Sequence, residues 1–318
     1  MSIDTGSNCT FVPDTVYTDA GVAGAGTLLS FIITNFLSLL LSAVIILLGL
    51  RKSTSAPLLR KLLLSFSDQQ IITGIGIQSI GLAKMKTMVP YHFFIIWLLS
   101  LLSTATNMAT LLALVNDFKR DWVLRWLRQF FMFINTLLSV LSSIFILQSV
   151  MKNLEPRLPI GCVWEVADRG TPSNAGLSIA GTIAVIAGNV IVFILSTWYL
   201  HNRTNPRWLK SVQVVGLIML TAMGIGATVR VVMVSQAFGT VPQGVNLVGP
   251  SESSWSYGQL LPLLLLVLPG ISMLEVVRGE TRTPPSKVDD EQGDQVGLLS
   301  DTELQGMTYQ PNPLWGKR

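Results

Sequence analysis

Apolar residues gather along this chain in long continuous runs rather than alternating with polar ones. An α-helix needs about 20 predominantly apolar residues to cross the roughly 30 Å hydrocarbon core of a bilayer. Runs of about that length or longer occupy residues 22–50, 62–83, 91–115, 129–150, 175–200, 211–238 and 259–277. The pattern therefore predicts an all-α fold, a polytopic transmembrane helical bundle of seven spans.

Composition favours a membrane protein over a soluble one. Of the 318 residues, 50% are hydrophobic and 13% are charged, and the mean hydropathy is +0.54. Soluble domains carry about 25% charged residues. Basic residues at the ends of the spans account for the formal net charge of +4, so this charge does not indicate a nucleic-acid partner. The expected partner is the lipid bilayer.

Basic residues also indicate the orientation, because cytosolic loops are enriched in lysine and arginine. With the N-terminus outside, sixteen Lys and Arg residues fall on the cytosolic side, five fall outside, and one lies within a span. We therefore predict a lumenal or extracellular segment at 1–21, a membrane domain at 22–277 and a cytosolic tail at 278–318. The acidic, proline-containing tail is expected to be disordered. The expected membrane is the endoplasmic reticulum or the plasma membrane.

Two features outside the membrane agree with this orientation. Asn8 begins the tripeptide Asn-Cys-Thr, a glycosylation acceptor on the lumenal side. Asn202 begins a second such tripeptide, which this topology places in the cytosol. The chain has two cysteines, Cys9 and Cys162, and both fall on the outer, oxidising side. They either form a disulfide or remain two free thiols.

Polar residues within the predicted spans form an inner layer. Asp68 and Gln70 lie in the second span, Asn107 in the third and Asn135 in the fourth. An ionisable residue within a span is costly and usually faces the protein interior. Asp68 must be protonated, paired or hydrated, and it is the first candidate for a catalytic acid. The alternative is that these residues only hold helices together through hydrogen bonds.

An outer layer combines His92 and Arg230 with two loop acids, Glu165 and Asp168. If Arg230 pairs with one of these acids over an externally open pocket, an acid, a base and a cation come together there. In that case Glu165 and Asp168 are further catalytic candidates, and His92 and Arg230 are binding residues. The alternatives are an ordinary interfacial histidine and an arginine whose long side chain reaches the headgroup layer.

Patterns typical of soluble enzymes are absent from the sequence, including a Walker loop, a nucleophile elbow and a zinc-binding helix motif. Two histidines and two cysteines give too few ligands for a dedicated metal site. We expect no metal and no other cofactor.

Four stretches resemble a family of filamentous-fungal seven-span integral membrane proteins. They are 68–74 (DQQIITG), 91–92 (YH), 103–107 (STATN) and 255–260 (WSYGQL). The resemblance covers about residues 66–268, and most members of the family are uncharacterised. It implies an association with secondary metabolism. Asn107 stands where the family pattern has histidine, so an acid or base role of that histidine cannot apply here.

Three functions remain open. The first is handling of a lipophilic metabolite, comparable in kind to membrane-bound terpene cyclases, in which a buried acid such as Asp68 protonates an olefin or epoxide. The second is a seven-span sensor or receptor without catalytic activity. The third is a transporter, although obvious internal repeats are absent.

Overall fold

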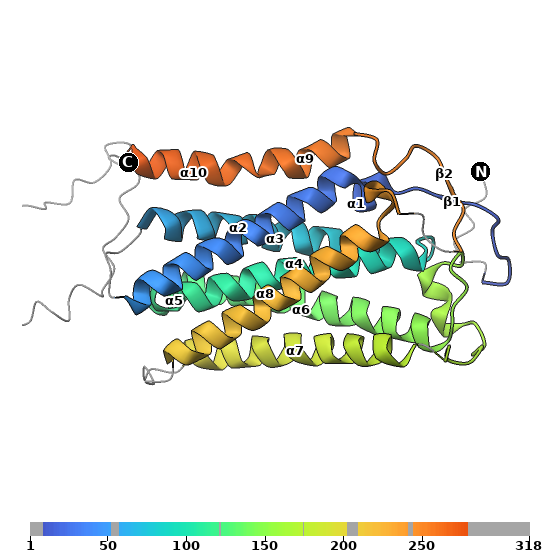
Figure 1. Cartoon of the computed structure of the whole chain (residues 1–318), viewed down its shortest axis with the longest axis horizontal. Coiled ribbons are helices and arrows are strands. Elements are labelled where there is room, and N and C mark those ends of the chain that lie inside the picture. The colour runs from blue at the N-terminus through green and yellow to red at the C-terminus, as the bar shows by residue number, and fades with distance from the viewer. Residues whose placement is uncertain are drawn as a thin grey trace, which may run out of the picture. The chain divides into compact units, whose positions relative to one another are not determined.

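The computed structural model describes residues 9–51, 57–120, 122–173, 175–201, 209–240 and 244–278. Its long helices lie side by side (Figure 1). They are α2 (Ala25–Leu50), α3 (Pro57–Ala83), α4 (Pro90–Ala113), α6 (Trp122–Met151), α7 (Gly176–His201), α8 (Leu209–Val234) and the consecutive pair α9 (Tyr257–Leu265) and α10 (Val267–Val277). Shorter elements are β1 (Val16–Tyr17), α1 (Ala20–Ala23), α5 (Val115–Arg120), β2 (Leu247–Val248) and two 3₁₀ turns, η1 (Ile160–Trp164) and η2 (Gln236–Phe238).

Among the described residues, six helical segments are long and apolar enough to cross a membrane. They are 20–50, 90–113, 125–151, 178–198, 210–234 and 257–274. The predicted all-α class is therefore confirmed, and these segments are compatible with an integral membrane protein. The helix α3 is as long as the others, at 27 residues. Its polar residues lower its mean hydropathy, so it is not among these six segments.

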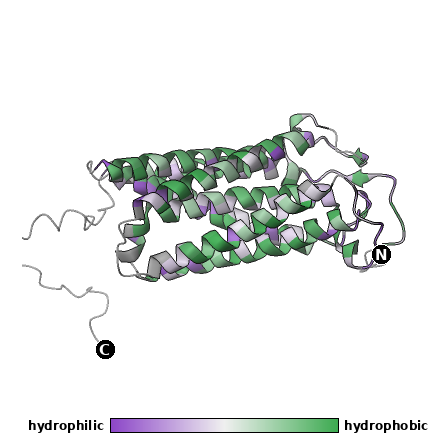
Figure 2. Ribbon diagram, turned by 60° about the horizontal axis from the view of Figure 1, so that its bottom comes forward, coloured by the Kyte–Doolittle hydropathy of each residue, from purple (hydrophilic) through white to green (hydrophobic). Residues whose placement is uncertain are grey.

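The surface of the helices is apolar and much of the interior is polar. Phe36 and Ile72 point outward with about two thirds of their surface exposed, and hydrophobic residues cover much of the helix ribbons in Figure 2. Serine, threonine, asparagine and glutamine side chains are instead buried between the helices. A soluble protein rarely exposes such large apolar areas, whereas a bilayer covers them.

The central element is α4. It packs against α2, α3, α6 and α8, and more weakly against α7. All of the residues in its most apolar stretch are buried. Because α4 is covered on every side, its polar side chains can find partners only within the protein.

We call one end of the bundle the disulfide end, because Cys9 and Cys162 are joined there. This is the bridge that the sequence left open, and it connects the N-terminal segment to η1. β1 pairs in parallel with β2, so Val16 lies opposite Leu247. The segments before α2, after α6 and after α8 therefore come together at this end. The opposite end carries α5, and we call it the α5 end.

The helix α3 joins the two ends. At the α5 end, Arg60 forms an ion pair of 2.9 Å with Asp117. At the disulfide end, Lys84, just after α3, forms an ion pair of 2.8 Å with Asp19. The helix therefore runs the full distance from one end to the other, as its neighbours do.

Hydrogen bonds between α3, α4 and α6 form a polar seam. Gln78 donates to the Asn135 side-chain oxygen at 2.9 Å, and Asn135 donates to the Thr104 hydroxyl at 3.2 Å. Nearer the α5 end, the Ser67 hydroxyl donates to Asn107 at 2.9 Å. Ser103 donates to the backbone carbonyl of Gln70 at 2.9 Å. Gln70, Asn107 and Asn135 thus lie in a contact between helices.

Close approach of the helices at this seam requires glycine at position 74. A Cβ there would lie 2.3 Å from the Ser103 hydroxyl and 3.0 Å from the Asn135 side-chain oxygen. At Gly76, two residues further along the same helix, a Cβ would meet nothing within 4 Å. The pair offers a matched test of the seam.

We expect Gly74→Ala to destabilise the bundle by about 1–3 kcal/mol, because the new methyl group forces α3 away from α4 and α6. Gly76→Ala should be neutral or stabilising by up to about 1 kcal/mol, since alanine favours a helix more than glycine does. Thermal unfolding of the two variants in detergent measures the difference. Equal midpoints for both would contradict the close packing at Gly74.

Candidate functional site

The start of α4 places two polar side chains at the disulfide end. Pro90 occupies the first turn of the helix, where its missing N–H costs nothing, and Tyr91 and His92 follow it. Both side chains contact Glu252, which lies in the segment between β2 and α9. His92 Nε2 lies 2.7 Å from one carboxylate oxygen, and the Tyr91 hydroxyl donates to the other at 2.9 Å.

Glu252 is held at this position from several sides. Its backbone carbonyl accepts a hydrogen bond from the Ala25 N–H at 3.2 Å, at the start of α2. Gln259 in α9 binds the same carbonyl and also the backbone N–H of Gly26. The hydroxyl of Tyr91 accepts from the backbone N–H of Gln236 at 2.8 Å. The cluster thus joins α2, α4, η2 and α9.

Because Glu252 and His92 are both buried, each needs a polar partner within the protein. Glu252 is 0% exposed and His92 is 2% exposed. A carboxylate withdrawn from water is tolerated only where hydrogen bonds and charge replace its hydration. With Glu252 ionised, the proton between the two groups lies on His92 Nε2, so the Nδ1 atom remains for another partner. The glutamate therefore orients the imidazole.

A cavity of about 600 Å³ lies beside this histidine. It is bounded by the N-terminal segment, by the turn between α3 and α4, and by Arg157 and Pro159 from the segment after α6. The side chains that line it include His92, three threonines, Lys84, Asp19 and Arg157. This mixture of positive, negative and hydroxyl groups suits a small polar molecule with several hydrogen-bonding atoms.

The structure places the sequence-predicted outer residues in separate positions. His92 reaches the cavity, but its acidic partner is Glu252 rather than Glu165 or Asp168. Glu165 is exposed, and Asp168 is an exposed residue whose carboxylate accepts from the N–H of Gly170 at 2.8 Å. Arg230 lines a hollow between α7 and α8 that neither acid enters. The predicted grouping of an acid, a base and Arg230 is therefore not formed.

Asp68 lies near the α5 end, with its side chain largely exposed. It forms an ion pair with Arg128, which also donates to the Ser67 hydroxyl at 3.1 Å. The Asp68 side chain is 57% exposed while that of Arg128 is 6% exposed. Of the three states that the sequence allowed for Asp68, the structure shows the paired one. An exposed, paired carboxylate does not supply a buried acid for protonating an olefin.

Glu252 was not among the sequence-based candidates. It stands in a loop, and a lone loop acid is ordinarily solvated. One signal was present, because it is the single acidic residue between 239 and 257. Its distance of 160 positions from His92 conceals the pairing in the sequence.

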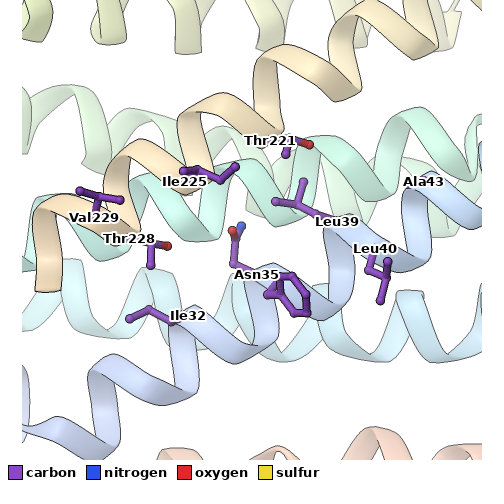
Figure 3. A pocket seen from close by; sticks show the side chains of 11 residues that line it. Ile32, Asn35, Leu39, Leu40, Ala43, Thr221, Ile225, Thr228 and Val229 are labelled. Atoms are coloured by element: carbon purple, nitrogen blue, oxygen red, sulfur yellow. The ribbon is translucent and has the colours of Figure 1, made fainter.

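Other hollows lie along the helices. Figure 3 shows a largely apolar groove of about 420 Å³ between α2 and α8. Asn35 points into it from α2, and the amide nitrogen of this residue donates to the Leu102 carbonyl and the Thr106 hydroxyl of α4. Within the ranges described, no group of three or more His, Cys, Asp or Glu residues could hold a metal ion. The predicted glycosylation site, Asn8, lies outside the described residues, as does 279–318 of the predicted tail.

Residues from the stretches 91–92, 103–107 and 255–260 contribute to both polar regions. Tyr91, His92 and Gln259 surround Glu252, and Ser103 and Asn107 belong to the seam. No protein-family model, no curated protein and no solved structure matches the chain.

Replacing Glu252 tests whether the cluster is integral to the fold. We expect Glu252→Ala to lower stability by roughly 3–5 kcal/mol, because the Tyr91 hydroxyl and the His92 imidazole lose their buried partner. Glu252→Gln keeps one acceptor oxygen and should cost less. Glu165→Ala, at an exposed position, should stay within about 0.5 kcal/mol of the unchanged protein. Thermal unfolding that ranks Glu252→Ala with Glu165→Ala would refute the assignment.

Proposed function

We propose that the chain is a seven-span sensor-like membrane protein that binds a small polar molecule in the cavity at the disulfide end. The observation that carries this proposal is the position of His92. This residue lines the cavity, and its Nε2 atom is bound by the carboxylate of Glu252.

The proposed topology has seven spans with the N-terminus outside. It is supported by α3, which extends between ion pairs at the two ends of the bundle and adds one crossing to the six apolar segments. It is also supported by the disulfide, which belongs to an oxidising compartment. The surplus of basic residues predicted on the other side gives the same orientation.

The chemistry of the cavity defines the class of ligand. A neutral His92 accepts a hydrogen bond at Nδ1, and a protonated one donates there. Lys84 and Arg157 supply positive charge at the rim, and Asp19 supplies negative charge. A ligand with a hydroxyl or acidic group toward His92 and further polar atoms toward the rim matches these side chains.

A sensor must relay binding across the membrane, and α4 supports such a relay. His92 lies in the first turn of this helix, which continues as the central element to the α5 end. Near that end, Asn107 of α4 binds Ser67, which in turn accepts from Arg128, the partner of Asp68. A shift of α4 caused by the ligand thus reaches contacts between α3 and α6.

One observation favours a second function, catalysis on the same ligand. A histidine oriented by a buried carboxylate and facing a cavity is an arrangement used for general acid–base catalysis. Handling of a metabolite therefore remains a proposal, with His92 and Glu252 in place of Asp68 as the acid–base pair. A product formed from the ligand, and lost in His92→Gln, separates this function from sensing.

The topology predicts which acceptor asparagine carries a glycan. We expect the protein expressed in a eukaryotic host to shift on a gel after endoglycosidase treatment. Asn8→Gln should abolish that shift, and Asn202→Gln should leave it unchanged, because the modifying enzyme acts only on the lumenal side. A glycan on Asn202 would reverse the proposed orientation.

The ligand site can be sought with small polar compounds screened by thermal unfolding. A compound present at 100 times its Kd stabilises the protein by about 2.7 kcal/mol. We expect this stabilisation to vanish in His92→Gln and to persist in Asp68→Asn, which alters the far end of the bundle. If every active compound stabilises His92→Gln as strongly as the unchanged protein, the cavity is not the binding site.

A further inference from the structure

The consecutive helices α7 and α8 enclose a slot that opens toward the bilayer. They hardly touch each other, although α8 packs along α4 and α7 packs along α6. In Figure 1 the two ribbons lie close together at their connection and diverge toward the disulfide end. The slot lies in the half of the bundle nearer the disulfide end, and α4 forms its floor.

Aromatic side chains of α4 line the floor of the slot, and small residues of α7 and α8 line its walls. Phe94 and Trp97 lie side by side with ring centroids 5.6 Å apart, and both line the slot. Gly181 of α7 and Gly226 of α8 line the two walls, and a Cβ at either would meet nothing within 4 Å. The two glycines therefore leave room for a guest rather than permitting contact between helices. The volume is about 360 Å³.

Among the described residues that line this slot, Arg230 is the one charged side chain. It lies four residues before the end of α8 at Val234, which is about 6 Å along the helix axis. Of the residues described, no Asp or Glu lines the slot with it. Arg230 is exposed, so its guanidinium is available to an anion from outside the described chain, and a carboxylate would neutralise its charge.

We propose that the slot binds a single-chain amphiphile with a carboxylate head, a fatty acid in its chemistry, taken up laterally from the bilayer. The guanidinium of Arg230 binds the carboxylate through its paired N–H donors. The apolar tail lies over Phe94 and Trp97 and between the glycine-bearing walls of α7 and α8. The site is separate from the cavity beside His92, and it stands whether or not that cavity binds a ligand.

The volume of the slot favours a ligand with one acyl chain over a phospholipid with two. A volume of about 360 Å³ is near the lower limit for small-molecule pockets, which is roughly 300 Å³, and it suits one chain rather than two. Arg230 is near the headgroup depth, so a carboxylate reaches it while the tail follows the slot toward the bilayer centre. A neutral alcohol of the same length offers the tail without the charge and serves as the chemical control.

The test uses the full chain in phosphatidylcholine nanodiscs with palmitic acid that carries a photoreactive diazirine near the end of its tail. After illumination, mass spectrometry should locate the label on the slot-facing segments of α4, α7 and α8. Arg230→Gln should lower the labelling about tenfold, the loss expected for one charge-assisted contact. Arg169→Gln removes an exposed arginine of the loop at the same end and should leave labelling unchanged.

A second pair of variants tests whether the apolar tail of the ligand occupies the slot. Gly226→Leu places a large side chain in the slot and should suppress labelling. Gly188→Leu on α7, outside the slot lining, should not; at both positions an added Cβ meets nothing within 4 Å. Unlabelled palmitate should compete, and hexadecanol should compete about tenfold less well. Equal labelling of Arg230→Gln and the unchanged protein would overturn the proposal. Equal competition by hexadecanol, or stronger competition by phosphatidic acid, would also overturn it.

Discussion

The structure depends on one constraint: the polar groups of the central helix α4 must be satisfied without water. Three of the helices packed against α4 supply hydrogen-bonding partners to its polar side chains. α2 supplies Asn35, α3 supplies Ser67 and a backbone carbonyl, and α6 supplies Asn135 and Ser139. In lipid an unpaired polar group costs several kcal/mol. The partners on the neighbouring helices therefore fix the rotation and depth of each helix around α4 more tightly than apolar packing alone can.

The same demand explains the cluster at the disulfide end. There Tyr91 and His92, in the first turn of α4, bind the carboxylate of Glu252, which comes from a distant loop. What differs is the charge. Serine and asparagine pairs in the seam are neutral and serve contact between helices, whereas histidine and glutamate are both ionisable. Polar interactions of similar geometry thus hold helices together in one region and place ionisable groups beside a cavity in another.

The sequence predicted those parts of the fold that depend on continuous local patterns. The first six apolar runs each correspond to a long helix and the seventh to the consecutive pair α9 and α10. Of the inner polar residues, Gln70, Asn107 and Asn135 are buried between α3, α4 and α6, whereas Asp68 is largely exposed. The helix that contains the fourth run begins at Trp122, earlier than the predicted 129, because the arginine- and tryptophan-rich stretch before it continues the helix beyond the apolar segment.

The site was less accessible to sequence reasoning because it depends on contacts between distant segments. Spacing placed His92 near the membrane surface, but it could not show which of several loop acids would reach it. Glu165 and Asp168 were the nearer choices in the chain, and they lie at the surface. Asp68 was expected in the interior because its span reads as apolar. The environment of Asp68 is set by Arg128 on α6, and no local sequence pattern shows that Arg128 lies beside it.

The bridge between Cys9 and Cys162 gives the protein an order of assembly. The N-terminal segment is synthesised first, yet its cysteine has no partner until the segment after α6 has been made. The pairing of β1 with β2 waits longer still, for the chain beyond α8. The cavity beside His92 is lined by residues between positions 13 and 159, and the contact of His92 with Glu252 is added only when the chain beyond α8 has been made. In the proposed topology, a chain with one helix inserted the wrong way round separates the segments that form the cavity, so the finished cavity is itself a record of correct insertion.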